Sequence, residues 1–382
     1  MTAPILPGQT IGILGGGQLG RMLAVAARRS GYRVAVVAPG GAATPCGQVA
    51  DEAHDAEPEP ALLRHLCEGV AAFTYEFENL SLEAVEAAAE RVPVRPSPYA
   101  LRVTQDRGLE KGFLRDQGLP TVPFESVTGA EAAAAAVERL GGPAVIKSAG
   151  LGYDGKGQAT VASAAEVPEV WASIGAEEVV VEARIDLAME VSVVAARGVD
   201  GGFVHYGVTE NRHRDHILDL SIADADIDPA VANEAVAIAR AVGEGLGAVG
   251  TYCVEFFIDA AGRLMVNEIA PRPHNSGHLT IEAAPVSQFD QQLRAVCGLP
   301  LGGTQRLAPA AMANLLGDVW AAGEPPWGEA FADPQATLHL YGKAQPRPGR
   351  KMGHVTVLAG SRDEAARRAG GIRGRLAPHL AE

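Results

Sequence analysis

Two glutamates occupy positions that a β-hairpin would bring face to face. The segment TYCVEFFIDAAGRLMVNEIA, residues 251–270, reads as two largely apolar strands joined by a turn centred on Ala261 and Gly262. In that register Glu255 and Glu268 are direct cross-strand partners, with Cβ atoms about 5 Å apart. Like charges so close repel unless a cation lies between them, and paired carboxylates suit Mg²⁺ bound to phosphates. The hairpin therefore predicts a magnesium site, with a surface carboxylate pair as the alternative.

A glycine-rich loop follows a lysine at the end of an apolar strand. Residues 143–161, PAVIKSAGLGYDGKGQATV, read as strand, loop and strand, and Lys147 ends the first strand. Such a loop is able to close over a triphosphate while Lys147 and Lys156 supply positive charge. It is not a Walker loop, because no Gly-Lys-Ser or Gly-Lys-Thr precedes a helix. The alternative is an ordinary hairpin turn.

A second glycine motif, GxGxxG at residues 15–20, lies between a predicted strand at 10–14 and a predicted helix at 21–30. Backbone N–H groups at such a helix N-terminus can hold a phosphate. A nicotinamide-dinucleotide site would also need an acid at the end of the next strand, but Ala-Pro-Gly stands there, at 38–40. A substrate phosphate or a structural turn is therefore favoured over a nicotinamide-dependent oxidoreductase.

Polar residues gather directly after the hairpin, in the run APRPHNSGH at 270–278. The prolines fix the backbone, so that Arg272, His274 and Asn275 can converge on a small ligand. Further on, four cations between residues 343 and 351 form a positive cluster in a chain of net charge -14. A solvated basic loop is one explanation of that cluster, and a substrate phosphate is at least as good a one.

The elements that must position these groups fall into three parts. Residues 1–100 alternate strands and helices, which predicts a Rossmann-like parallel sheet. Residues 101–304 are richer in strands and carry the glycine-rich loop. Residues 305–382 predict a small β-rich C-terminal domain. The expected fold class is thus mixed, α/β in the first part and α+β in the rest.

Composition narrows the class of protein. Of the 382 residues 47% are hydrophobic and 20% are charged, which is typical of folded globular chains. The net negative charge disfavours nucleic acid and anionic membranes as partners. No apolar run reaches the ~18 residues of a membrane span, and the N-terminus has no signal-peptide pattern. We therefore expect a cytoplasmic protein that acts on small molecules.

Taken in chain order, these motifs resemble those of an ATP-grasp enzyme, and more closely the 5-(carboxyamino)imidazole ribonucleotide synthase family of purine biosynthesis. The resemblance spans nearly the whole chain and rests on GGGQLGRM at 15–22, GYDGKGQ at 152–158, NEIAPRPHNSGH at 267–278 and RPGRKMGH at 347–354. The run HNSGH favours this family over the formate-dependent glycinamide ribonucleotide transformylases, which share the fold and stay as the alternative. The resemblance implies a pre-ATP-grasp domain, an ATP-grasp domain with a lid at about 122–187, a C-terminal domain, and a homodimer.

The resemblance also assigns residues to ligands. ATP would bind Arg102, Lys147, Gly152, Tyr153, Asp154, Gly155, Lys156, Gly157, Gln158, Glu182, Ala183, Arg184, Ile185, Glu190, His213, Asn267 and Glu268. The metal ligands would be Glu255 and Glu268. The ribonucleotide substrate would bind Gln18, Leu19, Glu76, Tyr153, Asp154, Arg272, His274, Asn275, Lys343, Arg350 and Lys351. Lys147, Asp154, Arg272 and His274 would take part in catalysis, with His274 handling a proton near the reacting amine.

The implied reaction joins bicarbonate to an amine at the expense of ATP. Bicarbonate would attack the γ-phosphate to give carboxyphosphate, and the exocyclic amine of 5-aminoimidazole ribonucleotide would capture its carbon. The cofactors would be ATP and Mg²⁺. Because carboxyphosphate hydrolyses readily, closure of the 152–158 loop would have to keep water out.

Overall fold

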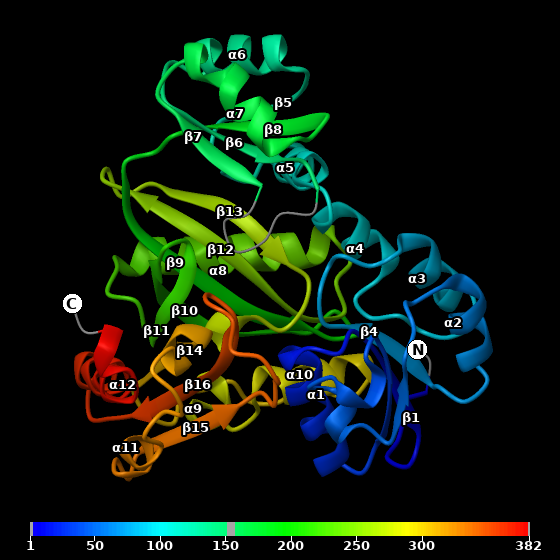
Figure 1. Ribbon diagram of the computed structural model, residues 1–382. Coiled ribbons are helices and arrows are strands. Elements are labelled where there is room, and N and C mark those ends of the chain that lie inside the picture. The colour runs from blue at the N-terminus through cyan, green and yellow to red at the C-terminus, as the bar shows by residue number, and fades with distance from the viewer. Residues whose placement is uncertain (1–2, 151–156, 381–382) are drawn as a thin grey trace.

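The computed structural model of the chain describes residues 3–150 and 157–380 (Figure 1). Its N-terminal part, blue in Figure 1, is a parallel sheet of strand order β3-β2-β1-β4, as the alternating pattern predicts. Strand β4 is buried throughout, so both faces of the sheet need cover, and the neighbouring helices supply it. The elements of this part are β1 Thr10–Leu14, α1 Gln18–Arg29, β2 Arg33–Val37, β3 Glu52–His54, α2 Pro60–Leu66, β4 Ala72–Tyr75, α3 Leu82–Ala89 and α4 Pro98–Thr104.

Helix α1 begins earlier than the sequence predicts. Its first residue is Gln18 rather than Arg21, because the turn after β1 closes at Gly17, which is the N-cap, and Gly20 already lies in the first helical turn. At the other end Gly31 has a φ of 81°, the left-handed conformation that ends helices and that glycine adopts without strain. The short turn brings the N-terminus of α1 directly to the end of β1.

A second, antiparallel sheet lies at the top of Figure 1 and has the order β5-β8-β6-β7. We call it the lid sheet. Strands β6 and β7 flank the glycine-rich loop, as predicted, and helices α6 and α7 pack against the sheet through an apolar core. Its elements are β5 Phe124–Thr128, α6 Ala130–Arg139, β6 Ala144–Ser148, β7 Gln158–Val161, α7 Val167–Ile174 and β8 Glu178–Ala183. Helix α5, Arg107–Asp116, precedes it.

The third sheet is antiparallel and runs β13-β12-β9-β10-β11-β14-β16-β15. We call it the central sheet, and α8 and α10 pack against it. Its elements and helices are β9 Leu187–Arg197, β10 Phe203–Arg214, β11 Ile217–Ala223, α8 Pro229–Gly245, β12 Gly250–Asp259, β13 Leu264–Ala270, α9 Thr280–Ala283, α10 Gln288–Val296, β14 Ala310–Leu316, α11 Gly328–Phe331, β15 Ala336–Leu340, β16 Lys351–Leu358 and α12 Arg362–Leu376.

The C-terminal strands continue the central sheet. Strand β14 pairs with β11, for example Ala311 with Ile222, so β14, β16 and β15 extend its edge. Within the described residues the predicted C-terminal part therefore has no sheet of its own, although α12 closes a separate apolar core over these strands. None of the helices that the structure describes has both the length and the apolar character needed to cross a membrane.

Candidate active site

Glu255 on β12 and Glu268 on β13 are direct cross-strand partners, as the sequence predicts. The turn between the strands differs from the prediction. It has three residues, 260–262, and is closed by the Asp259 N–H, which donates to the Arg263 carbonyl at 3.1 Å. Gly262 takes a φ of 78° in this turn. A three-residue turn shifts the pairing by one residue relative to the predicted two-residue turn.

A bulge restores the predicted pairing before the glutamates are reached. Next to the turn Phe256 pairs with Val266, whereas Glu255 pairs with Glu268, which leaves Asn267 as the extra residue on β13. The side-chain oxygen of Asn267 is buried and has no hydrogen-bond partner among the described residues. Glu255 and Glu268 therefore remain cross-strand partners because the turn and the bulge deviate by one residue each and cancel.

The loop after the hairpin folds back onto this pair. His274 Nε2 lies 2.8 Å from Glu255 Oε1, and its Nδ1 lies 2.9 Å from Ser276 Oγ. Against the effect of burial, Cys253 and Glu255 raise the pKa of His274 to about 10. Burial raises the pKa of Glu255, but His274 outweighs it and brings that pKa down to about 2. The contact between the two side chains ties the HNSGH loop to β12.

Helix α5 holds the chain on both sides of Glu268. The Glu110 carboxylate accepts a hydrogen bond from the Ile269 N–H at 3.2 Å, and Lys111 Nζ donates to the Asn267 carbonyl at 3.0 Å. Burial and the charge of Glu268 raise the pKa of Glu110 to about 8. Neither residue was predicted from the sequence, where the pair looks like ordinary helix charge.

Lys111 also belongs to a buried charge network that reaches the lid sheet. Glu182 on β8 is 3% exposed, and its carboxylate lies 2.7 Å from Lys147 Nζ and 3.3 Å from Lys111 Nζ. Burial alone would raise the pKa of Glu182, but the two lysines lower it below its usual value. The predicted ATP residues Lys147 and Glu182 are thus in contact, and Lys111 connects them to the hairpin.

Other predicted ATP residues lie in the lid sheet and in the central sheet. His213 Nδ1 on β10 lies 3.0 Å from Glu190 Oε2 on β9, and Glu190 raises the pKa of His213 against the effect of burial. Gln158 is the partner of Lys147 in the β6–β7 ladder, next to Gly157. At the end of β8, Ala183 and Ile185 are half-buried and Arg184 is exposed.

For Arg102 and the glycine-rich loop, binding of ATP stays a prediction. Arg102 is exposed on α4, and in the described parts of the chain no hydrogen bond or ion pair joins it to the other predicted ATP residues. Arg107, five residues further on, has its guanidinium 3.6 Å from Glu268 Oε2 and was missed by sequence reasoning. The predicted residues Gly152, Tyr153, Asp154, Gly155 and Lys156 lie outside the described residues.

The glycine turn before α1 holds a carboxylate of the protein itself. Glu76, 8% exposed, accepts hydrogen bonds from the Gly17 N–H and, at 2.7 Å, from the Gly20 N–H. Burial raises the pKa of Glu76, while these N–H groups oppose the shift. The helix N-terminus that the sequence offered as a phosphate site is therefore occupied by Glu76.

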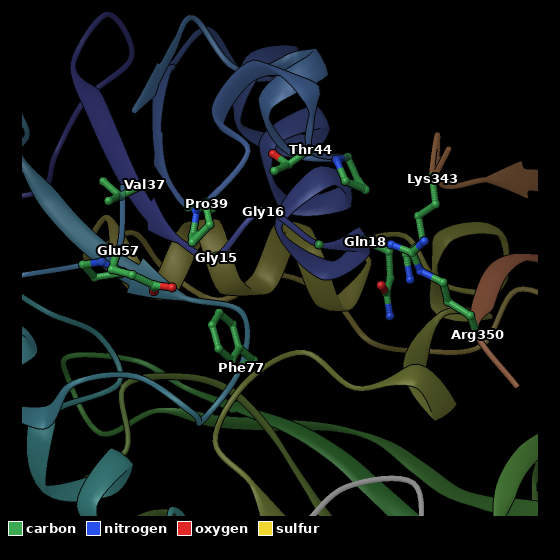
Figure 2. Close-up of a pocket in the computed structure, with 14 residues that line it drawn as sticks. Gly15, Gly16, Gln18, Val37, Pro39, Thr44, Glu57, Phe77, Lys343 and Arg350 are labelled. Atoms are coloured by element: carbon green, nitrogen blue, oxygen red, sulfur yellow. The ribbon is translucent and has the colours of Figure 1, made fainter. Parts of the chain in front are cut away.

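A cavity of about 310 Å³ opens beside this turn, and residues of the N-terminal and C-terminal parts of the chain line it (Figure 2). Gly15–Gly17 and Gln18 line it from the N-terminal part, and Lys343 and Arg350 line it from the C-terminal part. Figure 2 shows the two cationic side chains converging on one side of the cavity, with Phe77 at its lower edge. Leu19, which was predicted to complete this pocket, is instead buried in the apolar core under α1.

Arg272 and Asn275 extend the polar surface toward the hairpin. Arg272 Nε lies 3.0 Å from the carboxylate of Glu78, which raises the pKa of Arg272 against the effect of burial. Glu78 was not predicted, although it belongs to the same run, TYEFENL, as Glu76. Asn275 is 7% exposed, and both polar atoms of its side chain lack a partner among the described residues. Such buried, unpaired amides usually meet a ligand or ordered water.

The fold and the site are those of an ATP-grasp enzyme. Residues 8–105 match the ribonucleotide synthetase preATP-grasp domain, residues 112–289 the ATP-grasp domain, and residues 310–368 the phosphoribosylaminoimidazole carboxylase C-terminal domain. The chain is 43% identical to the N5-carboxyaminoimidazole ribonucleotide synthase of Brucella melitensis over 92% of its length and 97% of that protein. It is 40% identical to the Bacillus subtilis synthase over 94% of both chains.

Solved structures agree with these relatives. An ADP complex of N5-carboxyaminoimidazole ribonucleotide synthetase superposes with a TM-score of 0.92 at 38% identity, over 100% of both chains. The Aspergillus clavatus synthase in complex with ADP and 5-aminoimidazole ribonucleotide gives a TM-score of 0.88 at 30% identity, over 96% of this chain and 98% of that one. The chain belongs to the N5-carboxyaminoimidazole ribonucleotide synthase family, which confirms the resemblance seen in its motifs.

Proposed function

We propose that the chain uses ATP to carboxylate 5-aminoimidazole ribonucleotide with bicarbonate, giving N5-carboxyaminoimidazole ribonucleotide, ADP and phosphate in purine biosynthesis. The observation that carries this proposal is the contact between His274 and Glu255 at 2.8 Å. It brings the HNSGH loop, the motif that favours a carboxylating enzyme, onto the carboxylate pair that would serve ATP. The names of the relatives and the ligands of their structures support the same reaction.

The hairpin residues fit Mg²⁺. In the described part of the chain no three His, Cys, Asp or Glu side chains converge on one point. The hairpin would supply two carboxylates, those of Glu255 and Glu268, and the unpaired amide oxygen of Asn267. Mg²⁺ commonly binds through one or two carboxylates and completes its shell with phosphate oxygens and water. Bound there, the ion would neutralise charge on the phosphates of ATP.

ATP would lie between the lid sheet and the hairpin. Lys147, held by Glu182, would face the phosphates, and Arg107 beside Glu268 would add a second cation. The end of β8, residues 182–185, would meet the adenine, and Glu190 with His213 would take the ribose hydroxyls. The 152–158 loop, which ends with Gly157 and Gln158, would cover the triphosphate.

The ribonucleotide would lie in the cavity beside α1. Lys343 and Arg350 line that cavity, and with Lys351 they would bind its 5′-phosphate. Gln18, which also lines the cavity, and the Glu76 carboxylate, held by the Gly17 and Gly20 N–H groups, would contact the ribose. Arg272 and Asn275 would then direct the aminoimidazole toward the ATP site.

The reaction would take place in two steps. An oxygen of bicarbonate attacks the γ-phosphorus, the bond to the β-phosphate oxygen breaks, and ADP leaves. The exocyclic amine then forms a bond to the carboxyl carbon, inorganic phosphate leaves, and the amine loses a proton. His274, whose Nε2 lies 2.8 Å from Glu255 Oε1, would handle a proton near the reacting amine.

We also propose that the enzyme works in the cytoplasm as a homodimer, and this rests on the family to which it belongs. Light scattering on the purified protein tests the oligomeric state.

The test of the activity is ADP release with bicarbonate and with formate, each with and without 5-aminoimidazole ribonucleotide. We expect rapid release only with bicarbonate and the ribonucleotide together. Formate-dependent release would instead assign the chain to the transformylases, and consumption of a nicotinamide dinucleotide, followed by its absorbance, would assign it to the oxidoreductases.

A further inference from the structure

Two of the most specific sequence motifs end in histidines that the proposed chemistry does not use. HNSGH ends at His278 and RPGRKMGH ends at His354, and both side chains are 0% exposed. Their rings lie against each other, with centroids 4.9 Å apart and an interplanar angle of 38°. A contact between residues 76 positions apart thus joins the loop of His274 to the strand that follows the basic cluster.

On one side, His278 is tied to the backbone of His274. Gln288 Oε1 accepts a hydrogen bond from the His274 N–H at 2.8 Å, and Gln288 Nε2 donates to the His274 carbonyl at 2.7 Å. The same Nε2 lies 3.1 Å from His278 Nδ1. Because Oε1 must accept from the His274 N–H, Nε2 is the donor and His278 Nδ1 is the acceptor.

On the other side, His354 is tied to the loop of the phosphate cations. Tyr341 Oη lies 2.8 Å from His354 Nδ1, and the Tyr341 ring centroid lies 5.7 Å from Lys343 Nζ. Lys343 Nζ in turn donates to the Lys351 carbonyl at 2.6 Å, three residues before His354. A continuous line of contacts therefore runs from the His274 backbone to the Lys343 ammonium.

Both rings are neutral, which favours close packing between them. We call the contact between the His278 and His354 rings the joint. Burial lowers the pKa of His278 and of His354, and the nearby cations His274, Lys351 and Arg272 disfavour protonation of His278 further. Two neutral imidazoles in a tilted contact carry no charge repulsion, and buried aromatic pairs restrict each other's orientation. The His339 ring also stacks on His354, with ring centroids 4.4 Å apart, and His339 Nε2 lies 2.7 Å from Glu282 Oε1.

We propose that His278 and His354 are positioning residues, which fix the distance between the carboxyphosphate formed near His274 and the ribonucleotide held by Lys343 and Arg350. This inference rests on the proposed function. Neither histidine touches a substrate. Loss of the joint would leave ATP cleavage intact and impair capture of the carboxyl group, because an offset of about 1 Å between reacting groups is enough to slow a reaction strongly.

The experiment measures ADP formed per ribonucleotide consumed in wild type, His278→Leu and His354→Leu. We expect a ratio of one in the wild type and about two or more in both variants, since uncaptured carboxyphosphate hydrolyses. Unfolded molecules contribute to neither reaction, so a variant that folds poorly still gives a valid ratio. His278→Asn keeps an acceptor for Gln288 and should show less uncoupling than His278→Leu.

His339→Leu is the matched control, because it removes a ring from the same cluster without breaking the line from Gln288 to Tyr341. It should keep a ratio of one. The inference is overturned if His278→Leu and His354→Leu lose rate but keep a ratio of one, or if His339→Leu uncouples as strongly. A wild-type protein that consumes no ribonucleotide would overturn the proposed function instead, and the two failures are therefore distinguishable.

Discussion

The side chains of Glu255 and Glu268 differ in exposure, 11% against 41%, although the two residues are partners across one hairpin. If they share one Mg²⁺, either change to Gln leaves the phosphate charge without its bridging cation. Glu255→Gln and Glu268→Gln should each nearly abolish turnover, and the double variant should lose little more, because residues that act as a unit are not additive. The measurement is kcat across a Mg²⁺ titration.

Asp259→Asn is the control for this prediction. Its carboxylate also lies on β12, but it is paired with Arg263 at the turn and should be dispensable for turnover. Additive losses in the Glu255 and Glu268 variants would contradict a shared ion.

Gly17 is a second residue at which a small change should have a large effect. A Cβ there would lie 2.7 Å from Oε1 and 2.9 Å from Oε2 of Glu76, so Gly17→Ala must displace the carboxylate. We expect ribonucleotide affinity to fall by about tenfold or more, since a hydrogen bond to a charged group contributes roughly 1.5 to 3 kcal/mol. Calorimetric titration with the ribonucleotide measures the change.

Gly69→Ala serves as its control, because a Cβ at Gly69 meets nothing within 4 Å. Unchanged affinity in Gly17→Ala would mean that Glu76 only caps α1 and does not contribute to the substrate site.

At the scale of elements, the hairpin shows what sequence patterning can and cannot give. Apolar alternation and the position of Gly262 were enough to pair Glu255 with Glu268. The three-residue turn and the bulge at Asn267 were not predicted, because each depends on contacts outside the hairpin, such as the hydrogen bond from Lys111 to the Asn267 carbonyl. The pairing was predicted correctly because the two deviations cancel.

Long-range packing accounts for most of what the sequence did not reveal. Glu110 and Lys111 follow one another in a helix whose pattern is amphipathic, and only the fold shows that both are buried against β13. In the same way, β14 carries no local signal that it pairs with β11 rather than starting a sheet of its own. The parallel N-terminal sheet was predictable because strand, helix and strand follow each other closely along the chain.

Helix α5 gives a prediction at this scale. Lys111 is 1% exposed and connects Glu182, Thr121 and Asn267, so Lys111→Met removes one charge of a buried network. The unfolding free energy should fall by about 3 kcal/mol, because the charge of Glu182 is then only partly compensated by Lys147. Denaturant-induced unfolding measures the change.

Arg115→Met on the exposed side of the same helix should alter the unfolding free energy by less than about 0.5 kcal/mol. An equally small effect of Lys111→Met would show that Lys147 alone satisfies Glu182, and would remove the link that we describe between the lid sheet and the hairpin.

For the molecule as a whole, the buried histidines predict how stability depends on pH. Burial lowers the pKa of His278 and of His354, whereas histidine in an unfolded chain titrates near pH ~6.5. Below that pH the unfolded state binds more protons than the folded state, so acid lowers the unfolding free energy by about 1.4 kcal/mol per pH unit for each histidine. His354→Gln should therefore flatten the slope measured between about pH 5 and 6.5.

His65→Gln, at a side chain that is 74% exposed, should leave that slope unchanged. A slope that is equal in wild type and His354→Gln would show that His354 is protonated in the folded protein, and that the two rings do not form a neutral pair.

The two anion sites are built from distant parts of the chain, and this separation leads to the last prediction. Lys147 belongs to the lid sheet and pairs with Glu182, whereas Lys343 and Arg350 line the cavity beside α1. Since no residue is shared between them, Lys343→Ala and Arg350→Ala should raise KM for the ribonucleotide about tenfold or more and leave KM for ATP nearly unchanged. Lys147→Ala should weaken ATP binding and leave ribonucleotide binding measurable by calorimetry. If the Lys343 and Arg350 variants lose ATP affinity instead, the cavity beside α1 belongs to the nucleotide triphosphate, and the orientation of both substrates across the His274 loop must be reversed.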